Sequence, residues 1–224
     1  MLNLPTGDRA VSILKLIPMV FLAWPLSAQA WDVRLEAPFP QAQNLPQTTV
    51  QGAGQTSGSL GTGQGAIVTL SHRIMRMGPV LKYEWNVEYS QWQASGTLQQ
   101  GAASSGSRLR QSGFGAGVNA QFWVPFTGFA GELGLLERFQ TYRFDVAVAV
   151  QAENIARPWL RVGLRWVLPF PGIGPYLAAS YQAPLTRNRP VQAGSAQDLN
   201  AYLGAQGSGQ EFQHLWTVGL GIAF

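Results

Sequence analysis

The feature that most constrains this chain of 224 residues is a two-residue period of apolar and polar side chains. In the clearest segment, Leu81, Tyr83, Trp85, Val87 and Tyr89 alternate with Lys82, Glu84, Asn86, Glu88 and Ser90. Successive side chains of a β-strand point to opposite faces, so this period predicts a strand with one apolar and one polar face.

The same period recurs in eight segments. They cover residues 31–37, 65–75, 81–90, 113–124, 142–151, 159–168, 176–183 and 212–224. No internal repeat or second domain appears, so the pattern predicts one all-β domain.

Long and short links alternate between these segments. Polar links rich in Gly, Ser and Gln cover 38–63, 94–108 and 186–210, with a shorter one at 153–157, and tighter links cover 76–79, 125–139 and 169–174. This rotation is typical of an outer-membrane β-barrel, with long extracellular loops, short periplasmic turns and both termini periplasmic. Residues 125–139 fit least well, because they are long for a periplasmic turn. Within them, 131–138 suggests a short helix or a bulged start of the fifth strand, and 197–203 suggests a helical turn.

The first thirty residues resemble a targeting segment. Arg9 and Lys15 precede the apolar stretch 16–26, and the small residues of 27–30 suit cleavage after Ala30. We therefore expect a signal peptide at 1–30 and a barrel domain at 31–224. A retained N-terminal anchor helix is the alternative.

Composition narrows the environment of the predicted barrel. The chain has no cysteine, and loss of residues 1–30 lowers its net charge from +4 to +3. No run of Lys and Arg suggests nucleic acid, and no apolar run after residue 30 approaches the twenty or so residues of a helical membrane span. Charged residues make up 12% of the chain, about half the usual share of a soluble domain.

Alternation alone leaves open whether the apolar face points inward, as in a soluble lipocalin-like barrel, or outward into lipid. The small residues on the polar face favour the outward arrangement, because they make a poor solubilising exterior. Aromatic residues near the strand ends favour it too, as two interfacial girdles. The predicted girdles comprise Tyr83, Phe122, Tyr142, Phe144, Trp166 and Phe224 at one rim, and Tyr89, Trp159, Tyr181, Phe212 and Trp216 at the other.

The segment 216–224 resembles the C-terminal assembly signal of bacterial outer-membrane proteins, since apolar residues alternate up to a final aromatic residue, Phe224. By architecture and by this strand, the chain is similar to the small OmpA-type and OmpX-type barrels. The resemblance implies an eight-stranded antiparallel transmembrane β-barrel in the outer membrane of a Gram-negative bacterium. Its expected partners are outer-membrane lipids, lipopolysaccharide and the barrel-assembly machinery.

With the apolar face outward, the polar face lines the lumen with five acids and six bases. These are Asp32, Glu36, Glu84, Glu88 and Asp145, and Arg34, Arg73, Lys82, Arg143, Arg161 and Arg165. An eight-stranded barrel is only wide enough for side chains to fill it, so these charges are expected to pair as a structural plug. An ion or proton path is the alternative.

The sequence offers no catalytic, cofactor-binding or metal-binding constellation. Ser71 and His72 point to opposite faces of one strand, so they cannot form the Ser/His pair of a lipid A deacylase, and His214 suits the outer girdle. Two distant histidines without cysteine do not make a metal site. The glycines of 113–117 lie within a strand, where they are expected to face a crowded lumen instead of cradling a phosphate.

The sequence therefore predicts a non-enzymatic outer-membrane barrel that acts through its surface loops or as a structural component of the envelope. A lipid A-modifying enzyme and a narrow channel are the alternatives.

Deletion of Phe224, or its replacement by a charged residue, should block assembly of the barrel, because the apolar series of the last strand ends at this ring. Outer-membrane yield of the variant measures the effect. Normal yield would show that 216–224 is no assembly signal.

Overall fold

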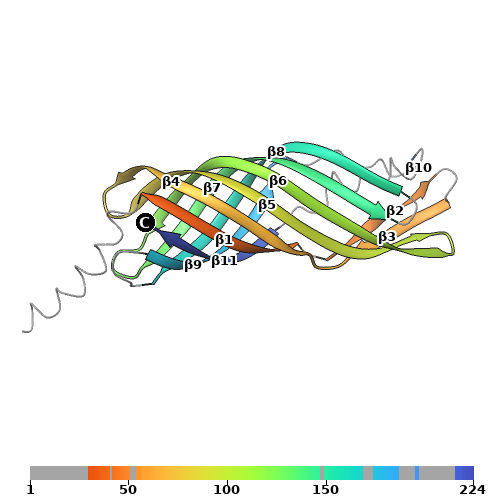
Figure 1. Ribbon diagram of the computed structural model, residues 1–224, viewed down its shortest axis with the longest axis horizontal. Helices are drawn as coiled ribbons and strands as arrows, with labels where there is room; N and C mark the ends of the chain where they lie inside the picture. Colours follow the sequence, from red (N-terminus) through yellow and green to blue (C-terminus); the bar gives the residue numbers. More distant parts are fainter. Residues whose placement is uncertain are drawn as a thin grey trace, which may run out of the picture.

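The protein, seen in a computed structural model, is described over residues 30–40, 42–50, 54–146, 149–168, 174–186, 195–196 and 215–224. Within these ranges it consists of β-strands (Figure 1). The strands are β1 (Trp31–Pro40), β2 (Gln43–Val50), β3 (Gly54–Leu60), β4 (Gln64–Met77), β5 (Leu81–Gln100), β6 (Ala103–Trp123), β7 (Phe129–Val146), β8 (Ala149–Val167), β9 (Gly174–Pro184), β10 (Ser195–Ala196) and β11 (Leu215–Ala223). In the described part, no helix has the length and apolar character needed to cross a membrane.

Eight of the strands close into a ring of antiparallel neighbours. The order is β1–β4–β5–β6–β7–β8–β9–β11, and β11 pairs with β1 from Asp32↔Ala223 to Pro40↔Leu215. Closure leaves no open edge in the ring, so backbone donors and acceptors are paired around the whole circumference. The predicted eight-stranded antiparallel barrel is confirmed.

The two ends of the barrel differ. At one, called the terminal end below, β1 begins and β11 finishes; at the other, the extended end, β5 to β8 continue beyond their neighbours (Figure 1). β5 to β8 have 18 to 21 residues each, whereas β1, β9 and β11 have 9 to 11. β3 pairs with β5 beyond the start of β4, and β2 and β10 follow β3. One side of the wall therefore rises well above the rest.

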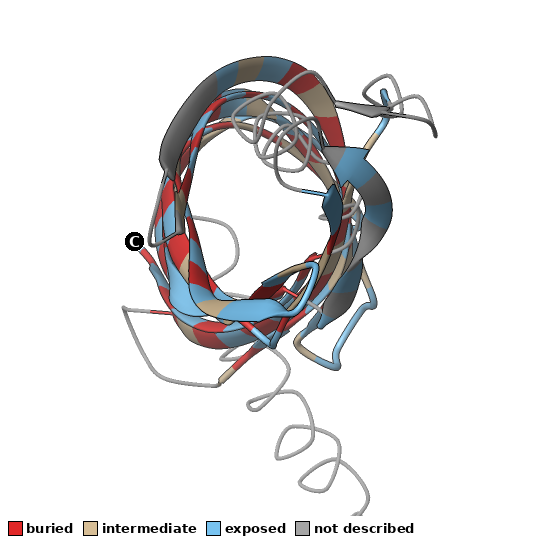
Figure 2. Cartoon of the chain, turned by 90° about the vertical axis from the view of Figure 1, so that its right-hand side faces the viewer, coloured by how far each residue is buried: buried red, intermediate tan, exposed pale blue. Residues whose placement is uncertain are grey.

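The apolar face of the ring points outward, as predicted for a membrane barrel. Leu164 and Leu220 are 65% and 64% exposed, whereas Glu36 and Arg161 are 1% and 0% exposed. Figure 2 shows buried and exposed residues alternating along the strands. A soluble barrel with an apolar core would have the opposite arrangement, so that alternative does not describe this part of the protein.

Aromatic residues form outward rows at two levels. Tyr89, Phe114 and Phe139 pair across β5, β6 and β7, and Trp216 pairs with Phe39 and Tyr181. Nearer the terminal end, the Trp31 ring lies 4.4 Å from the His72 ring. At the same end, the Phe129 ring lies 5.7 Å from the Trp166 ring.

The distance between the two rows suits a bilayer. Phe129 and Phe139 are ten residues apart on β7, and about 9–11 tilted residues cross a bilayer. The outward residues between these levels form the apolar belt. They include Val33, Leu35, Val68, Val87, Val118, Leu133, Leu135, Val162, Leu164, Val218 and Leu220.

Three residues predicted to lie in the girdles point inward instead. Tyr142, Phe144 and Trp159 are buried inside the barrel. Phe212 lies outside the described residues, as do His214, the signal peptide and the proposed helical turn at 197–203.

The polarity of the wall reverses beyond the outer aromatic row. On β5, Trp92, Ala94 and Leu98 point inward, whereas the outward positions are Gln91, Gln93, Ser95, Thr97 and Gln99. β6 shows the same reversal, with Leu109 buried and Arg108 and Arg110 outside. The extended wall therefore has a polar exterior and an apolar interior, the arrangement of a β-sheet that faces water.

Because of this reversal, several segments predicted as loops are strands in the structure. Residues 94–108 form the ends of β5 and β6 around a turn at Gly101 and Ala102, and 153–157 lies within β8. The link 38–63 contains β2 and β3. Ser95 of β5 and Gly106 of β6, predicted to be loop residues, occupy the outward face of these strands, whereas Ser107 is buried on the inward face.

The link predicted at 125–139 is also shorter in the structure. The chain turns at 124–128, with positive φ at Phe126 and Gly128, and β7 begins at Phe129. The prediction placed the strand at 142–151 with Tyr142 and Phe144 outward, because it followed the apolar phase of the extended wall. In contrast, the predicted turn at 76–79 is confirmed to within two residues, at 78–80.

Val87→Arg should destabilise the barrel by roughly 2–4 kcal/mol in a bilayer, since it places a charge in the middle of the apolar belt. Gln99→Arg, on the outward face of the same strand above the belt, should cost about 0–1 kcal/mol. Urea unfolding of both variants in lipid vesicles, followed by Trp fluorescence, measures the difference. Equal costs would mean that the belt does not face lipid.

Candidate functional site

A network of buried ion pairs crosses the lumen between the two aromatic levels. Glu132 of β7 accepts hydrogen bonds from Arg34 at 2.6 Å and from Arg165 at 2.9 Å. Arg165 also pairs with Asp32 at 2.5 Å, and Arg34 lies 3.6 Å from Glu36. Each carboxylate here serves more than one polar partner, which is what a buried charge needs to offset its desolvation.

The network continues toward the extended end through Glu88. Arg161 donates to Glu88 at 2.6 Å and lies 3.7 Å from Glu36, and Arg138 pairs with the other oxygen of Glu88. Arg138 also donates to Gln182 of β9. One chain of contacts therefore joins Asp32 to Arg138 along the lumen.

Neutral polar side chains tie further strands to this chain of charges. Thr217 of β11 donates to Glu36 at 2.6 Å, and the Tyr176 hydroxyl of β9 donates to Asp32. On the other side, Glu84 forms an ion pair with Lys82 at 2.5 Å and accepts a hydrogen bond from the Gln121 amide of β6 at 2.5 Å. Side chains of seven of the eight ring strands thus meet in one network, which holds the wall together across the lumen.

Apolar side chains accompany the network at both ends. Val167, Tyr176, Ala178 and Ala223 cluster at the terminal end, and Ile67, Leu136, Trp159 and Leu215 cluster beside its outer part. These clusters and the ion pairs lie inside the ring, at successive levels along the lumen.

Two arginines beside the outer cluster stack on aromatic rings. The Trp159 ring lies 4.6 Å from the Arg138 guanidinium and 5.2 Å from that of Arg157. Arg157 also donates to the Tyr142 hydroxyl at 3.1 Å. Burial raises the pKa of this Tyr142 phenol above its usual range, although the positive charge of Arg157 opposes the shift. The phenol therefore stays protonated well into the alkaline range.

Glycines provide the space that the largest lumen side chains occupy. A Cβ at Gly115 would lie 2.9 Å from Cγ of Glu88 and 3.1 Å from Cγ of Arg138, and one at Gly221 would meet the Tyr176 ring. These glycines leave room at an ion pair and at the partner of Asp32. The position in a crowded lumen predicted for the glycines of 113–117 is confirmed at Gly115.

The structure confirms eight of the eleven charged residues predicted for the lumen. They are Asp32, Glu36, Glu84, Glu88, Arg34, Lys82, Arg161 and Arg165. Arg143 and Asp145 were predicted wrongly: both point outward on the extended part of β7, and Arg73 is only half-buried near the terminal end. Glu132, Arg138 and Arg157 were missed because Glu132 and Arg138 lay in the predicted link, and Arg157 in a predicted loop. Their shared alternation with outward Leu133, Leu135 and Phe139 is the signal that would have revealed Glu132 and Arg138.

The described residues contain no metal-binding group of three or more acidic, His or Cys side chains. Ser71 is buried in the lumen, whereas His72 packs outside against Trp31 and Trp85, so the two lie on opposite faces as predicted.

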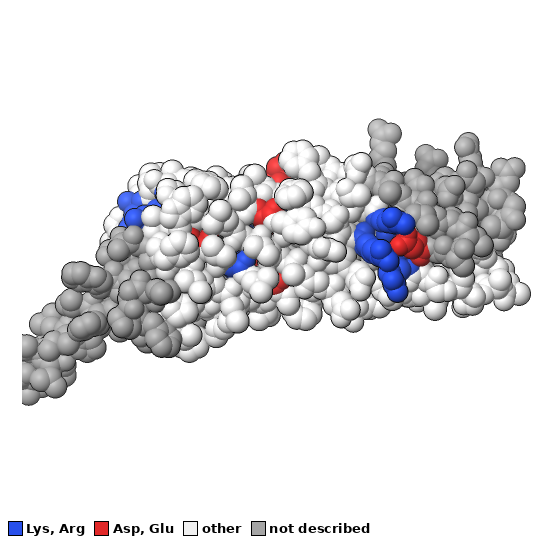
Figure 3. All heavy atoms as spheres, viewed as in Figure 1, with Lys and Arg blue, Asp and Glu red and all other residues white. Residues whose placement is uncertain are grey.

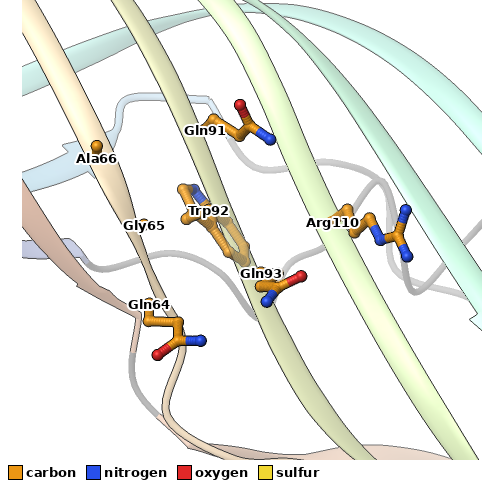
Figure 4. Close-up of a pocket in the computed structure, with 7 residues that line it drawn as sticks. All are labelled: Gln64, Gly65, Ala66, Gln91, Trp92, Gln93 and Arg110. Atoms are coloured by element: carbon orange, nitrogen blue, oxygen red, sulfur yellow. The ribbon is translucent and has the colours of Figure 1, made fainter.

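The extended wall carries polar grooves on its outer surface. One, of about 530 Å³, is lined from three neighbouring strands by Gln64, Gln91, Trp92, Gln93 and Arg110 together with Gly65 and Ala66 (Figure 4). Three amide side chains and one guanidinium offer both donors and acceptors there, which suits a hydroxyl-rich or carboxylated ligand.

Several solved structures are similar to that of this chain. Neisserial surface protein A (NspA) aligns over 86% of this chain and 95% of its own, at 12% identity and a TM-score of 0.43. The translocator domain of the autotransporter NalP from Neisseria meningitidis aligns over 96% and 95%, at 9% identity and a TM-score of 0.40. The outer membrane protease OmpT from Escherichia coli aligns over 88% and 94%, at 8% identity and a TM-score of 0.38.

No protein-family model matches the chain, and neither does any curated protein.

Glu132→Gln should destabilise the barrel by about 3–5 kcal/mol, since it leaves Arg34 and Arg165 buried without their shared carboxylate. Asp145→Asn is the matched control, because Asp145 also lies between two arginines but on the exposed surface, where the cost should be about 0–1 kcal/mol. Denaturant unfolding in detergent micelles measures both. A Glu132→Gln cost as small as that of the control would contradict a structural role for the network.

Proposed function

We propose that the protein is a non-enzymatic outer-membrane β-barrel of a Gram-negative bacterium and acts through the surface of its extended end. The observation that carries this proposal is the pairing of an outward apolar belt with a lumen full of charges. Only a lipid exterior stabilises that arrangement over its inverse, because water would solvate the charges and exclude the apolar side chains.

The filled lumen supports a recognition or structural role over conduction. The ion network and the two apolar clusters occupy the interior between the aromatic levels. An ion crossing this region would have to displace paired arginines, each of which would then remain buried without its carboxylate. The proposed role of the network is to fix the ring strands in position relative to one another.

The extended wall is the part of the molecule suited to recognition. β5 to β8 carry it beyond the apolar belt, and its outer face presents Gln, Ser, Thr and Arg side chains in shallow grooves. A rigid sheet holds such side chains in fixed positions, which favours specific binding at a small loss of entropy.

In cells, the protein should partition into the outer membrane and migrate faster in detergent gels before boiling than after it. The paired strands and buried ion pairs keep the barrel folded in detergent until it is heated. Recovery in the soluble periplasmic fraction would contradict the membrane assignment.

The purified barrel should show no stepwise conductance in planar bilayers, and its expression should leave the mass of lipid A unchanged. Steps of conductance would instead favour the channel. A shift in lipid A mass, or covalent labelling by a serine-directed lipid probe, would favour the enzyme.

A further inference from the structure

Three outward arginines lie close together on the extended wall. Arg108 and Arg110 of β6 and Arg143 of β7 surround the single carboxylate of Asp145, so this group, called the arginine cluster below, carries a net charge of +2. On the face shown in Figure 3, basic and acidic atoms gather at one place toward the extended end, whereas the middle of that face is mostly white with a few scattered charged atoms.

The register places like charges directly opposite each other in this cluster. Arg110 pairs across the strands with Arg143, an arrangement that destabilises a sheet unless an anion lies between the two guanidiniums. Asp145 lies 2.8 Å from Arg143 and 3.6 Å from Arg110. The two arginine side chains are still 55% and 49% exposed, so donors of both remain open to a second anion.

The height of the cluster relates it to the proposed membrane surface. Arg110 and Arg143 each lie four residues beyond an outer-row aromatic, Phe114 and Phe139 respectively. At about 3.3 Å per residue and a strand tilt near 45°, the arginines are roughly 9 Å further out than those rings. Aromatic girdles mark the headgroup level, so the guanidiniums lie at the outer edge of the lipid headgroups.

A shallow groove of about 620 Å³ runs outward from the aromatic row and ends two residues short of Arg110 and Arg143. Tyr89, Phe114 and Phe139 line its lower part, and Ser112, Thr141 and Asn154 line its upper part. The Thr141 hydroxyl lies 2.7 Å from the Asn154 amide oxygen. The outward carboxylate of Glu137 is on the far side of the aromatic row, two residues before Phe139, so the rings separate it from the arginines.

From the belt outward, this surface is apolar, then hydroxyl and amide, then guanidinium. That order matches one class of molecule, a phosphorylated glycolipid, whose acyl chains, sugars and phosphates follow one another in the same direction. We infer that the arginine cluster and the groove below it bind the phosphorylated headgroup of an outer-leaflet glycolipid. The inference rests on the proposed outer-membrane function, which sets the orientation of the barrel.

The test compares lipid adducts of the detergent-purified barrel by native mass spectrometry. The probes are diphosphoryl lipid A, its dephosphorylated form and phosphatidylglycerol. The double variant Arg110→Gln/Arg143→Gln should lower retention of diphosphoryl lipid A roughly 10- to 30-fold, because two surface arginines no longer attract the phosphate. Asp145→Asn should raise retention, since it removes the carboxylate that competes for both guanidiniums.

Arg76→Gln is the matched control. It removes one exposed positive charge instead of two, at the terminal end, where the Arg76 side chain donates to the Gly78 carbonyl at 2.9 Å. This variant should retain lipid A as the unchanged protein does. Heat-modifiable migration of each variant checks that it has folded.

Equal retention of diphosphoryl lipid A by the double variant would overturn the inference, as would equal retention of the dephosphorylated form. Equal retention of phosphatidylglycerol and diphosphoryl lipid A would also overturn the inference, because the groove would then not distinguish a sugar headgroup from a glycerol one. Failure of the proposed function itself has a different signature: the unchanged protein would not float with phospholipid vesicles in a density gradient.

Discussion

Closure of the ring is the constraint on which the rest of this structure depends. A strand edge left open in lipid would expose backbone groups with nothing to pair, so β11 must meet β1 in register over nine residue pairs. Eight strands then fix the width of the lumen, which holds side chains and little else. Every inward residue must therefore fit its neighbours in both size and charge. Gly115 beside the Glu88–Arg138 pair shows how closely the two are matched.

The reversal of polarity along the wall marks where one environment ends and another begins. On β5 the outward residues change from Val87 and Tyr89 to Gln91 and Gln93, while the inward ones change from Glu88 to Trp92. The backbone continues without a break through this boundary. The same strand is thus built for lipid in its first half and for water in its second, and the outer aromatic row lies at the junction.

This junction also explains which parts of the fold could be predicted from the sequence. Alternation within the belt predicted seven of the eight ring strands and the outward apolar face, since lipid imposes one clear phase. The exception is β7, whose belt residues 129–139 lay in a predicted link, so the predicted strand at 142–151 overlaps β7 only beyond the belt. Beyond Tyr89 the apolar phase shifts by one residue, and the small polar residues of 94–108 then resemble a loop. Tyr142 and Phe144 were placed outside for the same reason, and Arg143 and Asp145 inside. A local pattern states which residues alternate, but the surrounding medium decides which face is inward.

The candidate site was predictable to a similar extent. The abundance and near balance of lumen charges follow from parity along the strands, and Asp32, Arg34 and Glu36 could be assigned on that basis. The partners of these residues could not be assigned, because they are distant in the sequence. Glu132, for example, is 98 positions from Arg34. Barrel closure and strand register determine such contacts. The grooves of the extended wall were not predicted, because parts of the strands that line them resembled loops.

A buried ion network is an expensive way to fill a lumen, because apolar side chains of similar volume often stabilise a protein as well or better. Here the exterior is already apolar, and strands with two apolar faces would carry no information about which face turns inward. A register slip of one residue exchanges the faces, so it would place Glu88 or Arg161 against lipid and break several ion pairs at once. The charges therefore specify register and orientation in a way that an apolar core could not. Their cost in stability is offset by the exclusion of alternative barrels, and the pairing of Glu132 with both Arg34 and Arg165 ties three ring strands to a single arrangement.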